Sequence, residues 1–384
     1  MVQKKNLSIL SLNMCFGGAQ RVISLLLIQL IKDYNVSLVL FYDHVDFEIP
    51  KEVNIRVLFP QDNNKNTFYR KIKETLLVSR KYNKFIKNNN IDISMAFLAL
   101  PNIINGIVAQ RNTKLRTVIS ERCFPSLMYK ANKSSQFLAN YVIPIFYNKN
   151  DALFSNSINI NEDLKRNFNI KIPMSVIYNP IIIDENKRIL TDSIKSKKIL
   201  NFINVGSIYE AKNQSMILNA LALLNKSEYH YTQAGSGAME EEIKTYSKKL
   251  GLNNNTTFLG NISNVKDYLL NNDCFVLSSK TEGFPNVVLE ALATGLPVIS
   301  TNCMTGPLEL LNDNESIDIR QGDFTKAKYG LLVNVDDAEG LAKALEYFKN
   351  NPEERKRYSE VGFQRAKQNL MPIIYNQVKK LLEY

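Results

Sequence analysis

The stretch SSKTEGFPNVVLEALATGLPVIST, from Ser278 to Thr301, holds a loop, a helix and a strand in one short run. The residues before it, Cys274 to Leu277, are apolar and β-rich, which predicts a short buried strand. Pro285 suits the first position of a helix, and Gly295 suits the residue that ends one. Residues Pro297 to Thr301 are typical of a second strand. This order of strand, helix and strand predicts a parallel α/β sheet.

Two glutamates flank the start of the predicted helix. Glu282 lies in the loop, where Gly283 allows a backbone turn that a Cβ would oppose, and Glu290 lies in the helix itself. The N–H groups of a first helical turn have no partner inside the helix, so they can bind an anion. Two glutamates eight residues apart also occur often as solvated surface charges. The pair alone is therefore weak evidence for a site.

Length and composition limit the class of protein. With 384 residues the chain is too long for one ordinary core and fits two domains. Its four cysteines stand far apart without a CxxC pair, so reduced thiols explain them better than disulfides or a zinc site. The chain starts directly with a predicted strand, and no apolar run reaches membrane-spanning length. We therefore expect a cytoplasmic protein without a signal peptide.

The positive charge is confined to the first half of the chain. Residues 1–180 carry 24 Lys and Arg against 12 Asp and Glu, whereas residues 181–384 carry 24 against 25. Such asymmetry indicates a polyanionic neighbour: a nucleic acid, an anionic membrane or a phosphorylated substrate. Compositional drift in a Lys- and Asn-rich proteome is the alternative, but drift would load both halves alike.

Strands and helices alternate along the whole chain, with a break at 171–196 that is typical of a connection between domains. The pattern predicts two doubly wound domains, each a parallel sheet between layers of helices. Ligands of such sheets bind beyond the carboxyl ends of the strands, which for two facing domains means the cleft between them. The predicted strands cover 7–12, 36–42, 55–59, 91–97, 116–120, 152–155, 175–178, 200–205, 230–233, 257–259, 274–277, 297–301 and 330–333.

Several motifs together resemble glycosyltransferase family 4, the retaining enzymes of the GT-B fold. They are GGAQRV at 17–22, VGSIYEAKNQ at 205–214, AGSGAMEEEI at 234–243, FLGNISN at 258–264, EGFPNVVLEALATGLPVIST at 282–301 and GP-x-E-L at 306–310. The resemblance implies an α/β protein with two Rossmann-like domains facing across a cleft. Residues 1–180 would form the acceptor-side domain, 181–370 would bind the nucleotide sugar, and the helix at 371–384 would pack back on the first domain.

The resemblance also implies roles for individual residues around the donor. Glu282 would bind hydroxyls of the donor sugar, and Glu290 would accept both ribose hydroxyls of the nucleotide. Backbone N–H groups would surround the sugar and the diphosphate; they belong to Gly283, Phe284, Asn286 and Val287.

One departure from the family pattern concerns the departing diphosphate. The family has an arginine and a lysine in the 205–214 motif, and here Lys212 is present while Ser207 occupies the arginine position. Stabilisation of the leaving group would then depend on Lys212, the helix N-terminus and Ser207 as a neutral donor. An exposed lysine that opens a helix is the plainer interpretation of Lys212, and its place after a predicted strand favours the functional one.

Two further loops are candidates for donor contacts. Gly17 and Gly18 lie between the first strand and the first helix, where backbone amides can approach a phosphate closely, although a simple tight turn has the same pattern. Asn261 and Ile262 lie where the family holds the nucleotide base, and an ordinary turn explains them equally well.

Histidine and metal chemistry find little support in the sequence. His44 lies in an acidic loop and His230 within a predicted strand, so neither is placed for general acid–base catalysis. The sequence has no metal-ligand cluster and no Asp-x-Asp motif, as expected for enzymes that stabilise a diphosphate with cations and amides. We expect no cofactor and no metal, with the nucleotide sugar as co-substrate.

Three stretches of the first half bear on the acceptor and on location. TVISERCFP at 117–125 resembles relatives that build bacterial surface polysaccharides, so Glu121 and Arg122 would face the acceptor; a structural ion pair is nearly as plausible.

Residues 66–88 hold seven basic residues against Glu74 with an apolar side at helical spacing, which favours contact with an anionic membrane. For FLANYVIPIFY at 137–147 a helix packed in the core is slightly favoured over a membrane contact.

The sequence as a whole predicts a retaining glycosyltransferase. It would move a hexose or N-acetylhexosamine from a nucleotide sugar, a UDP-sugar before GDP-mannose, to a lipid-linked glycan at the inner face of a bacterial cytoplasmic membrane. Three alternatives stay open: a non-hydrolysing nucleotide-sugar epimerase, a catalytically idle scaffold suggested by Ser207, and a nucleic-acid binder. The last lacks basic motifs interleaved with aromatic residues.

Overall fold

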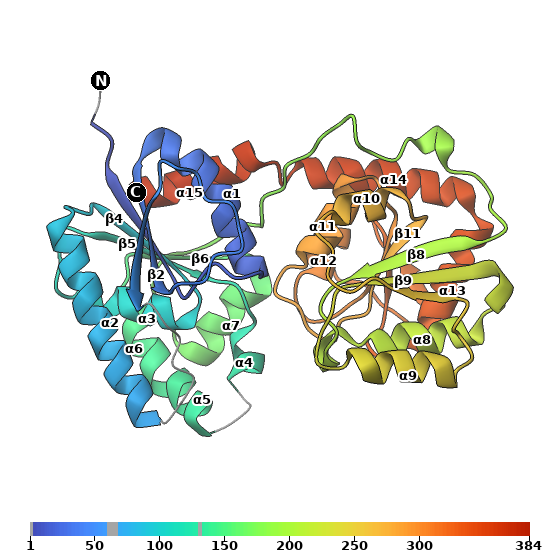
Figure 1. Cartoon of the computed structure of the whole chain (residues 1–384), viewed down its shortest axis with the longest axis horizontal. Coiled ribbons are helices and arrows are strands. Elements are labelled where there is room, and N and C mark those ends of the chain that lie inside the picture. Colours follow the sequence, from blue (N-terminus) through green and yellow to red (C-terminus); the bar gives the residue numbers. More distant parts are fainter. Residues whose placement is uncertain (1–2, 60–67, 130–132) are drawn as a thin grey trace. The chain divides into compact units, whose positions relative to one another are not determined.

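A computed structural model describes residues 3–59, 68–129 and 133–384, and the side chains of residues 68–73, 133 and 134 lie outside this description. The chain forms two compact units, which are described separately (Figure 1). Unit 1 comprises residues 1–180 and 371–384, and unit 2 comprises residues 181–370. Residues 66 and 67, the first two of the basic stretch 66–88, lie outside the described residues.

Unit 1 is a doubly wound α/β sheet. Its described strands are all parallel and run in the order β3-β2-β1-β4-β5-β6-β7, so the sheet grows outward in both directions from β1 and β4. Its elements are β1 (Asn6–Ser11), α1 (Gly18–Asp33), β2 (Asn35–Tyr42), β3 (Asn54–Phe59), α2 (Phe68–Asn88), β4 (Ile93–Phe97), α3 (Ala99–Ala109), β5 (Arg116–Glu121), α4 (Pro125–Met128), α5 (Lys133–Phe137), a π-helical turn (Leu138–Val142), α6 (Ile143–Tyr147), β6 (Ala152–Ser155), α7 (Ile158–Phe168), β7 (Met174–Val176) and α15 (Met371–Glu383).

The strands of unit 1 are apolar on both sides because helices cover both faces. In β1, Leu7 and Ile9 pack toward α1 and α15, while Leu10 packs into a second cluster with residues of α2 and α3. Alternate residues of a strand point to opposite faces, so a sheet covered on both faces needs a nearly continuous apolar run. The sequence LSIL at 7–10 meets this need, with Ser8 buried as well.

Unit 2 repeats the same architecture with one addition. Its described strands follow the order β10-β9-β8-β11-β12-β14-β13, and β13 alone among them runs antiparallel to its neighbour. Its elements are β8 (Leu200–Val205), α8 (Gln214–Leu223), β9 (Tyr229–Ala234), α9 (Glu240–Lys249), β10 (Thr256–Phe258), α10 (Val265–Leu270), β11 (Cys274–Leu277), α11 (Asn286–Ala293), β12 (Val298–Thr301), α12 (Pro307–Asn312), β13 (Phe324–Lys326), β14 (Leu331–Val333), α13 (Ala338–Asn350), α14 (Pro352–Lys367) and 3-10 turns at Thr191–Ser193, Glu210–Lys212 and Lys226–Glu228.

The predicted strands and the opening strand–helix–strand unit are confirmed to within about two residues, whereas several local features differ from prediction. The sequence did not predict α4, α12 or the edge strand β13, which are four, six and three residues long and too short for a periodic pattern. The helix expected at 137–147 is interrupted by the π-helical turn. Pro144 has no N–H for the carbonyl of residue 140, so the regular helical bond cannot form there.

That same segment packs in the core on one side, as predicted, and carries large apolar residues on its exposed side. Ala139, Ile143 and Tyr147 are buried, as a core-packed helix requires, but Phe137 and Tyr141 are 48% and 59% exposed. The segment therefore has two apolar faces, and only one of them is covered. Among the described residues, no helix combines the length and the apolar character that crossing a bilayer requires.

The C-terminal helix α15 is part of the core of unit 1. Ile374, Val378 and Leu382 are buried against the α1 face of the sheet, and the Tyr375 hydroxyl donates a hydrogen bond to Asp33. Lys379 adds an ion pair with Asp33 at 3.0 Å. These contacts explain why the last residues of the chain belong to the first unit.

Substitution of Ile374 by alanine should destabilise unit 1. Ile374 is 2% exposed, so its truncation leaves a cavity in the core and lowers the free energy of unfolding by about 2–4 kcal/mol. Ile373→Ala is the matched control because Ile373 is 44% exposed and its truncation leaves no cavity. Thermal unfolding followed by circular dichroism measures both variants. Equal melting temperatures for the two variants would contradict the docking of α15.

Candidate active site

The candidate site of unit 2 lies where its strand order reverses. β8 pairs with β9 on one side and with β11 on the other, and loops after β8 and β11 leave the carboxyl edge of the sheet side by side. Two hydrogen bonds join these loops: Lys280 N donates to Ala211 O at 2.8 Å, and Ser278 Oγ donates to Lys212 O at 2.7 Å. The two motifs of the sequence are thus one structural site.

Lys212 and Glu282 form an ion pair at the centre of this site. The Lys212 Nζ atom lies 2.5 Å from Glu282 Oε1, and Ser279 Oγ donates to the same oxygen at 2.6 Å. The side chains of Lys212 and Glu282 are 21% and 11% exposed. The pair is therefore shielded from most solvent yet open enough to meet a ligand.

Burial and charge act in opposite directions on the Lys212 ammonium. Burial lowers the pKa of Lys212, but the negative charge and hydrogen bond of Glu282 outweigh it and raise the pKa above its ordinary value. Lys212 is therefore a cation at neutral pH. Nearby, burial followed by the charge of Glu282 raises the pKa of Cys303 to about 12, so this thiol is neutral.

A second loop supports Glu282 from behind. Thr305 Oγ1 donates a hydrogen bond to the backbone oxygen of Glu282. Gly306 has a left-handed backbone (φ +89°), and a Cβ there would lie 2.5 Å from Pro285 Cδ. Gly306 is thus where the motif needs glycine; Gly283, where a special turn was expected, is not among the described glycines with positive φ.

Helix α11 starts directly after this loop. Pro285 is its N-cap residue, and no side chain caps the helix by a hydrogen bond. Glu282 precedes the first turn, Asn286 and Val287 open it, and the half-buried Glu290 lies one turn further on. Gly295 ends the helix region with a φ of +73°, as predicted. The motif therefore places its two carboxylates on either side of a helix N-terminus.

The loops after β8, β9 and β10 pack against one another without side chains between them. A Cβ on Gly235 would lie 2.2 Å from Gly206 O, and one on Gly237 would lie 2.2 Å from Ile208 O. Ser236 N donates to Asn261 Oδ1 at 3.1 Å, which ties the third loop to the second. These glycines are therefore explained by backbone packing, which also sets Ser207 and Asn261 at the same edge as Lys212.

In unit 1, the first two candidates lie at the corresponding switch point after β1. Gly17 has an extended backbone (φ −174°), Gly18 begins α1, and both are exposed. A Cβ on Gly17 would meet only the end of the Gln20 side chain, at 2.5 Å. The loop leaves the start of a 16-residue helix open to solvent.

Glu121 and Arg122, the other candidates in unit 1, are buried at 3% and 6% exposure. Glu121 Oε2 accepts a hydrogen bond from Tyr147 Oη at 2.7 Å. Burial raises the pKa of this carboxyl, although the hydrogen bond from Tyr147 lowers it. The Arg122 guanidinium lies over Phe154 and donates to Asn179 Oδ1 at 2.8 Å, and burial lowers its pKa to about 9. The structure thus places both residues in a polar network within the fold; their role toward an acceptor stays a prediction.

Comparison with known proteins identifies the family. The family model described as Glycosyltransferase Family 4 matches residues 16–185, and the one described as Glycosyl transferases group 1 matches residues 186–365. A relative from Campylobacter jejuni is 31% identical over 95% of this chain and 95% of its own; it is an N-acetylgalactosamine-N,N'-diacetylbacillosaminyl-diphospho-undecaprenol 4-alpha-N-acetylgalactosaminyltransferase. This chain belongs to glycosyltransferase family 4.

Solved structures agree with the GT-B fold of this glycosyltransferase. The lipopolysaccharide outer core galactosyltransferase WaaB has a TM-score of 0.74 at 18% identity, with 99% of each chain covered. Anabaena Alr3699/HepE in complex with UDP and glucose has a TM-score of 0.75 at 16% identity, also with 99% of each chain covered. Both Rossmann-like domains predicted from the sequence are therefore confirmed.

Several residues that hold the candidate site in place could not be recognised in the sequence. Ser279 and Thr305 hold the side chain and the backbone of Glu282, and neither stands out in the sequence. Asn213 has a left-handed backbone (φ 54°) and donates to Asp336 Oδ1 at 2.9 Å. An asparagine just before a helix was the available signal, since Asn tolerates that conformation.

Within the described part of the chain, His, Cys, Asp and Glu side chains do not gather in threes as a metal site needs.

Replacing Glu282 with glutamine should make Lys212 easier to acylate. Without the carboxylate charge, burial is the main influence left, so the pKa of Lys212 falls and more free amine is present at pH 8. Each unit by which the pKa of Lys212 falls raises its fraction of free amine roughly tenfold. Acetylation rates by mass spectrometry measure the change, with Lys244 in the same sample as internal reference. Unchanged labelling of Lys212 would contradict the electrostatic role of the pair.

Proposed function

We propose that this glycosyltransferase is a retaining enzyme that moves a hexose or N-acetylhexosamine from a UDP-sugar to a lipid-linked glycan. The observation that carries the proposal is the Lys212–Glu282 pair, set beside the start of α11, whose N-cap makes no side-chain hydrogen bond, at the switch point of unit 2. The C. jejuni relative acts, by its name, on a diphospho-undecaprenol acceptor, and the HepE structure contains UDP. Both support the choice of donor and acceptor class.

In the proposed reaction the charges of the site hold the donor. Lys212, Ser207 and the first-turn amides of α11 would stabilise the diphosphate as it leaves, since a cation and oriented dipoles favour developing negative charge. Glu282 would accept hydrogen bonds from sugar hydroxyls, and Glu290 would accept both ribose hydroxyls. The loops at Gly17–Gly18 and Asn261–Ile262 would complete the donor contacts.

The proposed chemistry leaves proton transfer to the substrates. The acceptor hydroxyl would attack on the face from which the nucleotide departs, and a phosphate oxygen of the donor would take its proton. The enzyme would contribute position and charge stabilisation, without a metal or another cofactor. Glu121 and Arg122 would lie on the acceptor side, where their network orders the carboxyl end of β5.

The proposed setting is the inner face of the cytoplasmic membrane in the synthesis of a capsule, O-antigen or exopolysaccharide. A lipid-linked acceptor requires the enzyme to work at a membrane surface. The positive excess of residues 1–180 and the basic helix α2 support attraction to anionic lipid. Nucleic acid is not part of the proposal.

Alanine substitutions should separate the roles of the two glutamates. Glu290→Ala should weaken UDP binding by roughly 10- to 100-fold, because two hydrogen bonds to a charged group are lost. Glu282→Ala should leave UDP affinity nearly unchanged and lower transfer by ~10²-fold. Titration calorimetry with UDP and a donor-turnover assay measure the two effects. Glu353→Ala is the control, since that side chain is 79% exposed on α14. Wild-type turnover and affinity in Glu290→Ala would refute the ribose assignment.

A panel of nucleotide sugars without acceptor should separate a transferase from an epimerase. The transferase slowly hydrolyses its donor, releases UDP and yields a free sugar that first appears with the anomeric configuration of the donor. The reaction should continue in EDTA, because Lys212 and helix amides carry the charge stabilisation. Proton NMR follows both sugar and nucleotide. Conversion of the donor into an isomeric UDP-sugar without UDP release would favour the epimerase, and no response to any nucleotide would favour the idle scaffold.

A further inference from the structure

A stripe of exposed, large apolar side chains runs along the helical segment 133–147 of unit 1. Phe137, Tyr141 and Ile145 are 48%, 59% and 54% exposed and lie four residues apart. The rings of Phe137 and Tyr141 are 5.2 Å apart between centroids. Isolated apolar side chains are common on protein surfaces, whereas a contiguous row of large ones usually marks a contact site.

The π-helical turn aligns this stripe. In a regular α-helix, residues four apart drift around the axis by ~40°, so a row of three would turn away from one plane. The wider turn at Leu138–Val142 has more residues per turn, which offsets this drift between Phe137 and Ile145. On the opposite side, Ala139, Ile143 and Tyr147 remain in the core. The π-helical turn therefore keeps one set of side chains in the core and the other set in a row on the surface.

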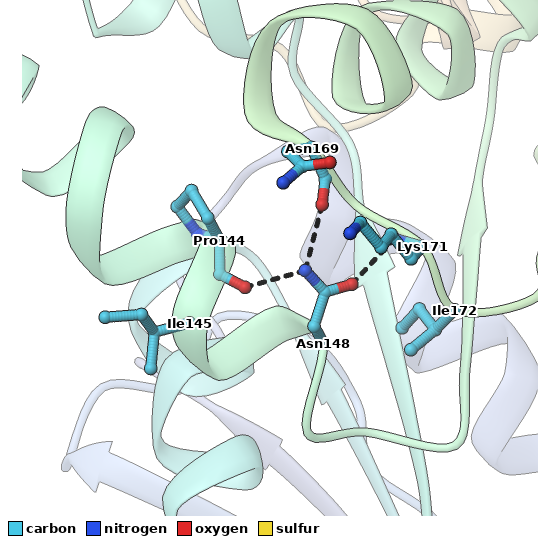
Figure 2. Close-up of a pocket in the computed structure, with 6 residues that line it drawn as sticks. All are labelled: Pro144, Ile145, Asn148, Asn169, Lys171 and Ile172. Atoms are coloured by element: carbon cyan, nitrogen blue, oxygen red, sulfur yellow. Dashed lines mark hydrogen bonds between the residues drawn. The ribbon is translucent and has the colours of Figure 1, made fainter.

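An open hollow of about 530 Å³ adjoins the end of the stripe (Figure 2). Pro144, Ile145 and Asn148 line it from one side, and Lys171 and Ile172 lie across from them. Asn148 Nδ2 donates to Pro144 O at 2.8 Å, and Asn148 Oδ1 accepts from Lys171 N at 2.7 Å. Because Asn148 is bound to the protein itself, the hollow offers the apolar side chains of Pro144, Ile145 and Ile172 together with Asn169 and Lys171.

The surroundings of the stripe favour a negatively charged partner. Between Ile93 and Asn150 the only acidic residue is Glu121, which is 3% exposed. Lys149 and Lys171, at the end of the stripe, are exposed. Asp151, the next acid along the chain, accepts hydrogen bonds from the backbone N and the side chain of Thr117. No acidic side chain of the described segment 133–150 opposes the two lysines.

We propose that Phe137, Tyr141 and Ile145, flanked by Lys149 and Lys171, form the surface that inserts into the interface of an anionic phospholipid bilayer. This inference deepens the proposed function, which requires a lipid-linked acceptor. Aromatic and branched side chains bind at the level of lipid headgroups, and lysines beside them gain from anionic lipid. The sequence alone had slightly favoured a core-packed helix with a solvated face for this segment.

The test uses a single tryptophan, because the chain has none. Tyr141→Trp in the full-length protein is titrated with vesicles of phosphatidylcholine alone or mixed with phosphatidylglycerol. The emission of this tryptophan should shift to the blue on the mixed vesicles, be quenched by brominated lipid and recover in high salt. Leu223→Trp is the control, since Leu223 is 60% exposed on unit 2, and its emission should stay unchanged.

A loss-of-function variant tests the same surface independently. Replacing Phe137, Tyr141 and Ile145 together with serine should lower binding in vesicle sedimentation by roughly tenfold or more. Leu223→Ser is the matched control and should bind as the wild type does. The changed side chains are exposed, so the triple variant should keep its melting temperature and its acceptor-free donor hydrolysis.

The outcomes distinguish this surface from other partners and from the proposed function. Unchanged emission of Tyr141→Trp on both kinds of vesicle would overturn the proposal. A shift that appears only when a polyprenyl diphosphate is added to phosphatidylcholine vesicles would also overturn it, because the acceptor lipid would then be the occupant. Vesicle binding by a protein that hydrolyses no nucleotide sugar would support the surface and refute the proposed transferase.

Discussion

The ion pair of Lys212 and Glu282 is the contact on which the site of unit 2 depends. The two residues are 70 positions apart in the chain, and they meet because β8 and β11 are neighbours in a parallel sheet whose loops leave the same edge. Ser279 and Thr305 fix Glu282 from two sides, and Gly306 lets the supporting loop approach closely. The conspicuous motif is therefore half of a site that the strand order completes.

The pair also sets a physical condition on any donor. In the protein without a ligand, the largely buried Lys212 keeps its charge through Glu282. A bound diphosphate would take over this stabilising role, since it brings negative charge to the same ammonium. With Ser207 in place of a second cation, this exchange rests on Lys212 and the amides of α11. Because Ser207 carries no charge, the Lys212–Glu282 pair thus becomes more important for keeping a cation in the site.

The sequence predicted those parts of the structure that local chemistry determines. The β11–α11–β12 unit was predicted because Pro285, Gly295 and an apolar strand mark its boundaries. The contact between Lys212 and Glu282 could not be predicted from spacing, since it depends on pairing between distant strands. The same holds for segment 133–147: its apolar residues indicated a packed helix, but periodicity does not tell which of two apolar faces meets a core.

The distribution of charge between the units argues that the positive excess serves contact at a surface. Unit 1 carries 26 Lys and Arg against 13 acids, while unit 2, which holds the cationic Lys212, carries 22 against 24. In the proposed reaction, binding of a diphosphate would therefore rely on one local cation and oriented amides, and not on the overall charge of its domain. At physiological salt a charge is screened within ~8 Å, so a broad positive excess acts only on a partner that lies close against it. A flat anionic surface would meet that condition, and the proposed apolar stripe beside Lys149 and Lys171 would give such a surface a place to bind.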